Sequence, residues 1–557
     1  MMIKDEIATI LAAAVTAAQG QGTLPAVPVP HTPIERPQRP EHGDYASSLP
    51  MRLARAASMP PLKIAEAIVD QLNRAAESDD RLEEVYAAPP GFINFRLAPA
   101  WLATQVEEIA KSGPQFGDVE AGRGQRIQVE FVSANPVGPI HVGNGRGLAL
   151  GDTLARVLTA AGYEVEREYF VNDAGTQTQV FADTLYARYQ QLFGREVAIP
   201  EGGYPGEYMS EMAVAIKAEH GDSLLRDAGE PAPKELHDLG IATMLASIKE
   251  DLAAIGVRYD NWFSERSLYD GDRYEEAMDV LRERGFVTER EGATWFVSTS
   301  LGEEKDNVLV RSTGAPTYFA SDVAYHYDKF HVRNFDRVID VWGADHQGHV
   351  PRMKAAVAAL GLEPERLEIL IYQLVTLKRG GEVVKLSKRA GDIVTLRDVV
   401  AEVGADAARF NFIARAADSH MDFDLDLAKE QSAENPVYYV QYAHARIAGI
   451  LGQAAERGLD FAEGDVQLLQ EEAELALIRK MLRLPELIEN MAQSLEPHPL
   501  PYYAMELATA FHDFYEKCRV LSEDEALTKA RLKLVSAVRI VLARSLDLMG
   551  MTAPERM

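Results

Sequence analysis

The stretch from Gln128 to Gly175 constrains the fold more than any other part of the chain. Residues 127–132 alternate apolar and polar side chains, which predicts a strand. A loop with two prolines follows, because neither a helix nor a ladder continues through it. Apolar residues at helical spacing from Arg146, with a stop at Gly162, predict a helix, and residues 163–171 predict a second strand. The segment is therefore a strand–loop–helix–strand unit.

His141 and Asn144 stand at the expected mouth of this helix. A helix N-terminus presents unpaired N–H groups and a positive dipole end, which suits a phosphate. The glycines that would let a ligand approach the backbone are Gly143, Gly145 and Gly147. Their spacing differs from a dinucleotide-binding fingerprint, because Leu148 stands where the third glycine belongs. The glycine pattern alone leaves phosphate binding and a plain tight turn open.

Length and composition bound the class of protein. A chain of 557 residues, 47% of them hydrophobic, predicts several domains with ample core. The net charge of −28 argues against a nucleic-acid partner, although local basic patches can exist on an acidic chain. The single cysteine, Cys518, excludes an internal disulfide and makes a cysteine-based zinc site improbable. The first residues lack a signal-peptide core and no stretch is long and apolar enough for a membrane span, which predicts a cytoplasmic protein.

Two later segments carry candidate ligand-binding side chains. Residues 337–342 predict a buried strand that ends at polar residues, and the carboxyl edge of a parallel sheet is where such folds bind ligands. A metal site is not predicted there, since no second cluster of ligands accompanies the histidines. Tyr318 and Asp322 are four apart on one helical face. A carboxylate beside an aromatic wall suits a guanidinium group, although a helix cap or a surface contact would use the same pair.

A basic run, Lys385-Leu386-Ser387-Lys388-Arg389, follows a hairpin turn at Gly380-Gly381. By itself such a run is usually a solvated loop. The capping-box pattern from Thr395 to Asp398 predicts that a helix begins just after it.

Taken together, the motifs resemble those of a known family. The run His141-Val142-Gly143-Asn144 is similar to the His-Ile-Gly-His signature of class I aminoacyl-tRNA synthetases, with Asn144 in place of the second histidine. The basic run resembles their Lys-Met-Ser-Lys-Ser loop. The context from Glu130 to residue 175, together with the residues at 549–557, resembles the arginyl-tRNA synthetases in particular, over essentially the whole chain.

The resemblance implies a ligase that activates L-arginine with ATP and transfers it from arginyl-adenylate to the 3′-terminal adenosine of tRNA(Arg), releasing AMP and diphosphate. It implies ATP with Mg²⁺ as a substrate complex and no structural zinc. The partners would be tRNA(Arg), L-arginine and ATP, with no membrane, and the chain would be a monomer. Two alternatives remain: a class I synthetase for another amino acid, and a non-catalytic tRNA-binding paralogue.

The resemblance also assigns residues to sites, here by their numbers in this sequence. The catalytic residues would be His141, Asn144, Lys385 and Lys388. ATP would be bound by those four together with Gly143, Gly343, Asp345 and Ser387. Arginine would be bound by Glu130, Ser133, Asn135, Tyr318, Asp322 and His346. The tRNA would meet Arg52 and Arg55 near the N-terminus, and Tyr438, Tyr442, His444 and Arg446 near the C-terminus.

The expected fold is α/β, with a Rossmann-type parallel-sheet catalytic domain, an N-terminal α/β domain and a C-terminal all-α helix bundle. Residues 1–115 would form the tRNA-contacting N-terminal domain. Residues 116–434 would form the catalytic domain, with an insertion around 176–328. Residues 435–557, with helical stripes of apolar residues, would form the anticodon-binding bundle.

Overall fold

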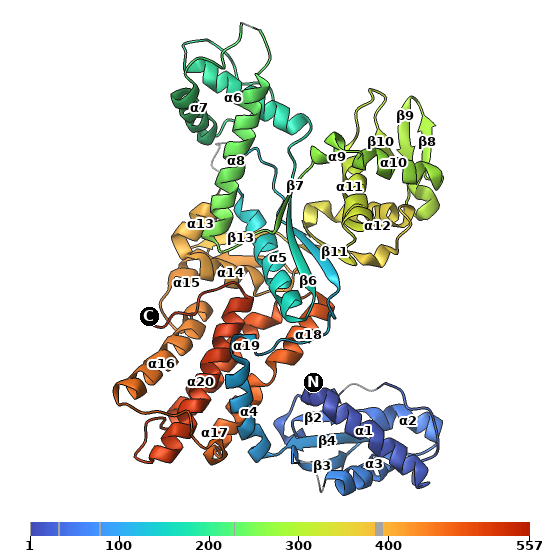
Figure 1. Ribbon diagram of the computed structural model, residues 1–557, viewed down its shortest axis with the longest axis vertical. Helices are drawn as coiled ribbons and strands as arrows, with labels where there is room; N and C mark the ends of the chain where they lie inside the picture. The colour runs from blue at the N-terminus through green and yellow to red at the C-terminus, as the bar shows by residue number, and fades with distance from the viewer. Residues whose placement is uncertain (1, 32–33, 77–79, 228, 385–393) are drawn as a thin grey trace.

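The computed structural model describes residues 2–31, 34–76, 80–227, 229–384 and 394–557. A five-stranded sheet lies at its centre (Figure 1). The first residues of the chain form a small separate domain, and the last residues form a bundle of long helices. This arrangement confirms the expected α/β class with its two flanking domains.

The N-terminal domain is a four-stranded antiparallel sheet with the order β1-β2-β4-β3 and helices packed on it. Its elements are α1 (Ile3–Gly20), β1 (Ile34–Glu35), β2 (Tyr45–Ser47), α2 (Leu49–Ala57), α3 (Pro61–Ala76), β3 (Leu82–Ala88) and β4 (Phe92–Leu97). The helix that follows, α4 (Pro99–Ser112), packs against α17 and α20 of the C-terminal bundle.

The central sheet is entirely parallel, with the order β12-β11-β5-β6-β7. Its strands are β5 (Arg126–Phe131), β6 (Glu164–Val171), β7 (Asn261–Ser264), β11 (Arg337–Gly343) and β12 (Leu367–Tyr372). Each side of β5 is covered by a neighbouring strand, so the loop after β5 emerges at the middle of the carboxyl edge. That edge is where a parallel sheet of this kind binds its ligands.

Helix α5 (Val142–Ala160) lies unusually close to its neighbours because it carries glycine where they approach. A Cβ at Gly151 would stand 2.3 Å from the Phe131 ring, at Gly147 2.5 Å from Tyr372, and at Gly145 2.7 Å from Phe412. The prediction that Gly145 and Gly147 admit a ligand is therefore wrong, since both face buried aromatic side chains. Their physical role is close packing of the helix.

Two segments with their own cores interrupt the sheet between β6 and β11. The first contains α6 (Thr176–Gln191), α7 (Glu207–His220) and α8 (Lys234–Ala254). The second contains α9 (Ser267–Asp270), α10 (Arg273–Glu283), β8 (Val287–Arg290), β9 (Ala293–Phe296), β10 (Asn307–Val310) and α11 (Tyr318–Tyr327). Strand β7 lies between these segments in the chain and pairs with β6. The region expected to be an insertion thus contributes one strand to the sheet edge.

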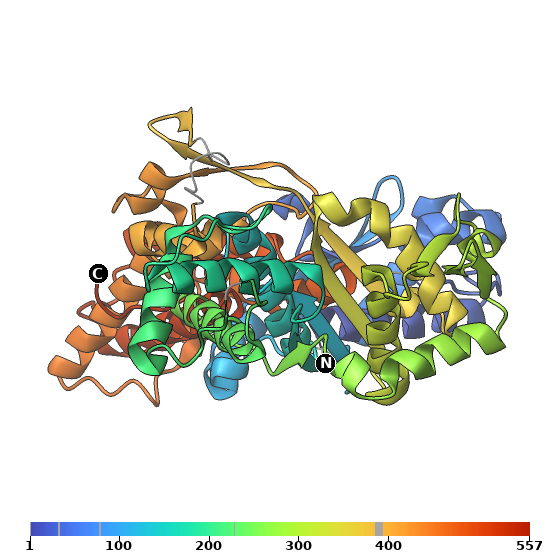
Figure 2. The ribbon, with the colours of Figure 1, turned by 90° about the horizontal axis from the view of Figure 1, so that it is seen from above.

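After β12 the chain builds a small mixed sheet and several short helices. These are β13 (Val375–Arg379), β14 (Glu382–Val383), α13 (Leu396–Val403), α14 (Ala405–Ile413), β15 (Met421–Asp424) and α15 (Leu425–Lys429). Helix α12 (Val350–Ala359) lies between β11 and β12 in the chain. The hairpin of β13 and β14 projects from the body of the molecule (Figure 2). Its turn is Gly380-Gly381, both with positive φ, and the capping box at Thr395 and Asp398 begins α13; both were predicted.

The C-terminal bundle contains α16 (Pro436–Glu456), α17 (Glu472–Met481), α18 (Leu484–Ser494), α19 (Pro499–Lys517) and α20 (Glu525–Leu548). A buried guanidinium joins it to the central domain. Arg409 of α14 donates to the carbonyl of Met549 at 2.6 Å and pairs with Asp152 of α5. Within the ranges described, no helix is long and apolar enough to cross a membrane.

Candidate active site

The loop after β5 is held in an uncommon conformation. Val132 and Ser133 both have positive φ, a backbone region that L-residues seldom adopt, which turns the chain sharply at the carboxyl edge of the sheet. The Ser133 hydroxyl donates to Glu130 Oε1 at 2.9 Å and accepts from the Phe170 amide at 3.1 Å. Asn135 accepts from Asn172 at 2.9 Å. The structure therefore brings Glu130, Ser133 and Asn135 together at one bend.

The next turn of the chain forms the mouth of α5. His141 is its N-cap residue, and its Nδ1 accepts from the Gly143 amide at 2.9 Å. An Nδ1 that accepts leaves the ring proton of neutral histidine on Nε2, so this edge is a donor. Asn144 lies near the hydroxyl of Tyr372, whose pKa is raised to about 12 mainly by burial while Asn144 opposes the rise. The helix thus begins at Val142, earlier than its apolar pattern predicts.

The second signature lies entirely outside the residues that the structure describes. Lys385, Leu386, Ser387, Lys388 and Arg389 all lie in the gap between residues 384 and 394. The chain is described again from Val394. There the Val394 carbonyl accepts from the Val142 amide at 3.1 Å, and the Leu396 amide donates to Ile140 at 2.8 Å. The segment that begins at Val394 is therefore joined by backbone hydrogen bonds to the mouth of α5.

Strand β11 ends beside the same mouth. Gly343 is its last residue, and a Cβ there would lie 3.6 Å from the Tyr372 hydroxyl. A short 3-10 turn (Ala344–His349) then leaves Asp345 and His346 exposed. Gly343, Asp345 and Asn144 therefore all lie near the Tyr372 side chain. The His346 ring packs edge-to-face with Trp342, with 6.2 Å between the ring centroids.

Helix α11 carries the other predicted pocket residues. It begins at Tyr318, with Thr317 as a hydrogen-bonded N-cap, so Tyr318 and Asp322 do lie one turn apart. Tyr318 is 48% exposed and its ring lies beside Gly175, which leaves its face open to a ligand. The pKa of Asp322 is raised to about 6, mainly because the carboxyl is buried, while His326 opposes the shift.

A third carboxyl group at this place was missed by sequence analysis. Glu265 directly follows β7, is 3% exposed, and has a buried Oε2 with no hydrogen-bond partner. Its other interactions are with the Ser321 hydroxyl and the backbone of Ala174. Burial, with Asp322 and Asp173 nearby, raises its pKa to about 7. Its position after a strand was the available signal, but β7 has only four residues and no clear alternation.

The predicted tRNA-contacting residues lie in two separate places. Arg52 and Arg55 are exposed on α2 of the N-terminal domain. On α16, Tyr438 and Tyr442 stack at 5.9 Å, and the Arg446 guanidinium lies 5.0 Å from the ring of Tyr442. Three of the four α16 residues therefore share one surface.

The fourth, His444, does not belong to that surface. It is 3% exposed, and its Nδ1 is 2.8 Å from the carbonyl oxygen of Pro554. The prediction that it offers a donor to unpaired bases is wrong, because it is used to hold the chain's last residues against α16.

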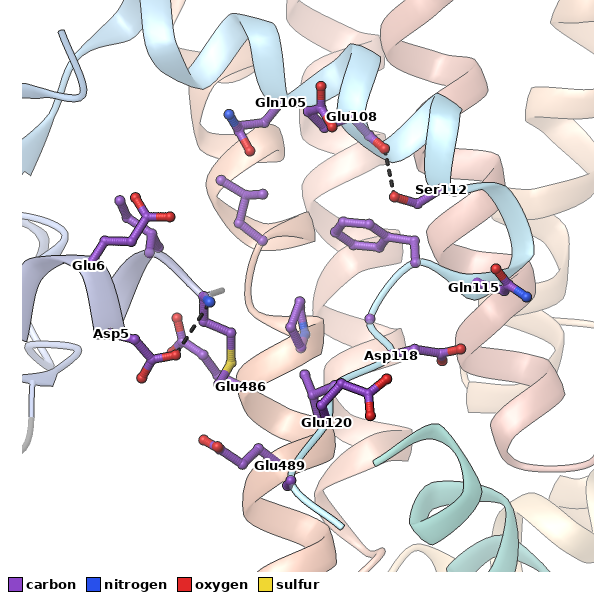
Figure 3. Close-up of a pocket in the computed structure, with 18 of the residues that line it drawn as sticks. Asp5, Glu6, Gln105, Glu108, Ser112, Gln115, Asp118, Glu120, Glu486 and Glu489 are labelled. Carbon is purple, nitrogen blue, oxygen red and sulfur yellow. Dashed lines mark hydrogen bonds between the residues drawn. The ribbon is translucent and has the colours of Figure 1, made fainter. Parts of the chain in front are cut away.

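A cleft elsewhere in the molecule has the wrong charge for phosphates. It measures about 860 Å³ and lies between the N-terminal domain, α4 and α18 (Figure 3). Its labelled carboxylates include Glu6, Glu108, Glu486 and Glu489. Glu486 accepts from Arg36 at 2.9 Å, and Glu489 pairs with Lys4, so these acids join the N-terminal domain to the bundle.

Comparison with known proteins covers the whole chain. Residues 2–97 match the model of the arginyl-tRNA synthetase N-terminal domain, and residues 105–448 match that of the class I (R) tRNA synthetase catalytic domain. Residues 440–557 match the DALR anticodon-binding domain. An arginine–tRNA ligase of Dehalococcoides mccartyi strain CBDB1 is 55% identical over 557 residues, 100% of this chain and 99% of that protein. The chain belongs to the arginyl-tRNA synthetase family.

Other members of the arginyl-tRNA synthetase family are similar to this chain in sequence and in structure. The ligase of Heliobacterium modesticaldum is 48% identical over 562 residues, covering 100% of this chain and 99% of that one. The crystal structure of a putative family member from Campylobacter jejuni superposes with a TM-score of 0.76 at 34% identity, over 83% of this chain and 100% of that one. The Thermus thermophilus arginyl-tRNA synthetase shares the fold, with a TM-score of 0.76 at 24% identity over all of both chains.

Proposed function

We propose that the chain is an arginine–tRNA ligase: it activates L-arginine with ATP and transfers the arginyl group to the 3′-terminal adenosine of tRNA(Arg), releasing AMP and diphosphate. The observation that carries this proposal is the full-length identity of 55% to a protein named for that activity. A cluster of acidic side chains near the carboxyl edge of the sheet (Glu130, Asp322 and Glu265) supports it, because a cationic side chain is the substrate that such a cluster favours.

We assign the two ends of the amino acid to different side chains of this acidic cluster. Asp322 and the unpartnered oxygen of Glu265 would accept from the guanidinium, with Tyr318 and His346 beside it. Glu130, Ser133 and Asn135 would meet the α-ammonium and carboxylate. Lysine would be rejected because a compact ammonium cannot satisfy two carboxylates as a planar fork of five donors can.

The mouth of α5 would bind ATP. Nε2 of His141, the amide of Asn144 and the backbone at Gly143 offer donors at a helix N-terminus, where a phosphate is favoured. Gly343 and Asp345 would meet the adenosine. Lys385 and Lys388 of the second signature would add positive charge to the phosphates, and Ser387 would add a hydroxyl donor. Val394, further along the chain, accepts from the Val142 amide at this mouth.

The chemistry of activation needs positioning more than proton transfer. The carboxylate of arginine is already ionised at neutral pH and attacks the α-phosphorus, and diphosphate leaves. Catalysis then depends on alignment and on donors where negative charge grows. Mg²⁺ would enter with ATP and be held by its phosphates; among the described residues no group of three His, Cys, Asp or Glu side chains is placed to hold a metal ion.

The tRNA would span the molecule from the N-terminal domain to the bundle. Arg52 and Arg55 would meet phosphates, and Tyr438, Tyr442 and Arg446 would stack on unpaired anticodon bases. We propose that the protein acts as a cytoplasmic monomer and requires bound tRNA before it activates arginine. Residues 1–115, 116–434 and 435–557 would be its three functional domains.

One experiment tests substrate, chemistry and coupling together. Arginine-dependent exchange of pyrophosphate into ATP is measured with and without tRNA(Arg), with lysine as the control amino acid. Exchange with arginine only when tRNA is present is the expected result. Exchange without tRNA would remove the coupling and keep the enzyme. Binding of tRNA with no exchange under either condition would overturn the ligase and favour a non-catalytic paralogue.

A further inference from the structure

Three acidic side chains lie in a row across the central sheet. Glu130 of β5 is in register with Asp340 of β11 on one side and with Glu168 of β6 on the other. All three are buried. Like charges placed opposite each other on neighbouring strands destabilise a sheet. This carboxylate row (Asp340, Glu130 and Glu168) therefore needs cations close to it.

One segment of the chain supplies the cations. Helix α11 continues into a π-helical turn (Asp328–Val332), and Lys329 in that turn is fully buried. Its Nζ lies 2.7 Å from Glu130 Oε2 and 2.9 Å from Asp340 Oδ1. Arg333 donates to Glu168 at 2.9 Å. π-Helical turns are rare in proteins, and those that occur are often found at functional sites.

His326 connects the row to the arginine pocket. Its Nε2 lies 3.0 Å from Asp340 Oδ2, and its Nδ1 lies 2.7 Å from the backbone oxygen of Asp322. One ring nitrogen thus faces a backbone oxygen and the other faces a carboxylate. Asp322 and Lys329 belong to one continuous helical segment. The ion pairs that Lys329 makes with Glu130 and Asp340 therefore also fix the position of Asp322 relative to Glu130.

The charge state of Glu130 depends on Lys329. Burial raises the pKa of Glu130, Lys329 opposes that rise, and Asp340 adds to it. Burial lowers the pKa of Lys329, but Asp340 and Glu130 outweigh it and the net shift is upward, so the lysine stays charged. With Oε2 occupied by Lys329, Glu130 keeps Oε1, shared with the Ser133 hydroxyl, at the bend beside the pocket.

We propose that Lys329 is a positioning residue for the amino-acid substrate: by bridging Glu130 and Asp340, it keeps Glu130 ionised and oriented toward the α-ammonium of arginine while the site is empty. This inference rests on the proposed function, because it assigns the α-ammonium to Glu130. Without Lys329, two adjacent buried carboxyls would share a proton, and the arriving ammonium would have to displace it.

Other charged groups face this pair, and they define what the test must hold constant. Glu168 comes from β6, and Tyr325, His326, Asp322 and Arg333 come from α11 and the residues that follow it. Of these, the Tyr325 hydroxyl is hydrogen-bonded to Glu168, which is also paired with Arg333. Lys329 is therefore the cation that Glu130 and Asp340 have in common.

The test is the pH dependence of kcat/KM for arginine in aminoacylation of tRNA(Arg), since this parameter reports ionisations of the free enzyme. In Lys329→Met we expect the acidic limb to move upward by about one pH unit or more, with roughly a tenfold lower kcat/KM at pH 7. Adding Asp340→Asn removes the competing carboxyl and should return the limb toward the wild-type position. Lys329→Arg should keep the wild-type limb.

The matched control is Lys354→Met. Lys354 of α12 donates to the carbonyl oxygen of Pro364 at 2.8 Å and also to that of Leu367, and its loss should lower stability without moving the limb. If Lys329→Met does not fold, as judged by circular dichroism, His326→Gln gives the same test with a smaller upward shift, because it removes the second partner of Asp340.

A limb that does not move in any folded variant, or moves equally in Lys354→Met, overturns the inference and leaves the ligase intact. If the wild-type chain does not charge tRNA(Arg), the proposed function fails instead. The same pH series is then run by calorimetric titration with arginine, where an unchanged affinity profile in Lys329→Met overturns the positioning role.

Discussion

The Gly143 amide donates to Nδ1 of His141 at 2.9 Å, so one imidazole caps helix α5 and, when neutral, carries its proton on Nε2. The two roles can be separated by substitution. An asparagine at this position keeps an oxygen that can cap the helix, but it lacks the long reach of the imidazole.

We therefore expect His141→Asn to retain stability while lowering kcat for aminoacylation by about 10²–10³-fold, the usual effect of losing one donor to developing charge. His141→Ala should show the same loss of activity together with about 1 kcal/mol lower unfolding free energy. Urea unfolding and steady-state kinetics check both. Wild-type kcat in His141→Asn would exclude a role for the ring in catalysis.

The raised pKa values of Glu265 and Asp322 predict a pH dependence of arginine use. The pKa values of Glu265 and Asp322 are raised to about 7 and about 6, chiefly by burial, and a guanidinium binds the ionised forms. Since the guanidinium stays charged throughout, kcat/KM for arginine should rise as pH increases through this range.

Glu265→Gln should remove the upper ionisation and shift the rise toward pH 6, with roughly tenfold or greater loss at neutral pH. Asp322→Asn should cost about 10²-fold or more, because it leaves part of the guanidinium unpaired. Asp279→Asn, at a carboxylate on the surface of α10, is the control. An unchanged profile in Glu265→Gln would place that carboxyl outside the pocket.

The aromatic surface of α16 predicts a loss confined to tRNA. Stacking on a base is worth about 1–3 kcal/mol, so Tyr442→Ala should raise KM for tRNA(Arg) by about tenfold or more while KM for arginine stays constant. Tyr502→Ala, at a tyrosine of α19 that is 47% exposed, is the matched control. Equal effects of the two substitutions would show that the bundle contacts tRNA elsewhere.

The buried pair of Asp152 and Arg409 predicts a pH-dependent contribution to stability. Burial raises the pKa of Asp152, but Arg409 and Arg156 outweigh it, and the net pKa is below the ordinary value. The pair therefore stabilises the fold above the unfolded pKa of Asp152, and this contribution is lost as pH falls through the lower, folded value.

Asp152→Asn should lower the unfolding free energy by about 3 kcal/mol at neutral pH, because it leaves the Arg409 guanidinium buried without its counter-ion. The deficit relative to wild type should shrink in strongly acidic solution. Denaturant titrations at pH 7 and near pH 3 check the sign. A deficit that grows as pH falls would contradict this account of the pair.

Sequence periodicity was sufficient for the elements that carry the signatures. The strand before Val132, the hairpin turn at Gly380-Gly381 and the capping box at Thr395 are local patterns, and the structure confirms them. The start of α5 was placed too late because its glycines interrupt the apolar stripe. Two of those glycines, Gly147 and Gly145, leave room for the rings of Tyr372 and Phe412, which are more than two hundred residues further along the chain.

The pocket was only partly predictable for the same reason. The sequence indicates Asp322 because Tyr318 stands one helical turn before it. Glu265 follows a short strand with no apolar–polar alternation, and only the folded chain brings its carboxyl group near that of Asp322. His444 was misread because its partner, the Pro554 carbonyl, lies 110 residues further along. No sequence pattern around Lys329 indicates its role, because its two partners, Glu130 and Asp340, lie on separate strands far from it in the chain.

The carboxylate row also limits how this enzyme can change by mutation. Lys329, Asp340 and Glu130 balance one another inside the sheet, so any single charge-changing step among them passes through a variant with an unpaired buried ion. Redesign of the amino-acid pocket for another substrate would therefore be easier at Tyr318 and Asp322, near the open end of α11, than at Glu130. The two ends of one substrate would follow different mutational routes, one taken in single steps and the other only in concerted ones.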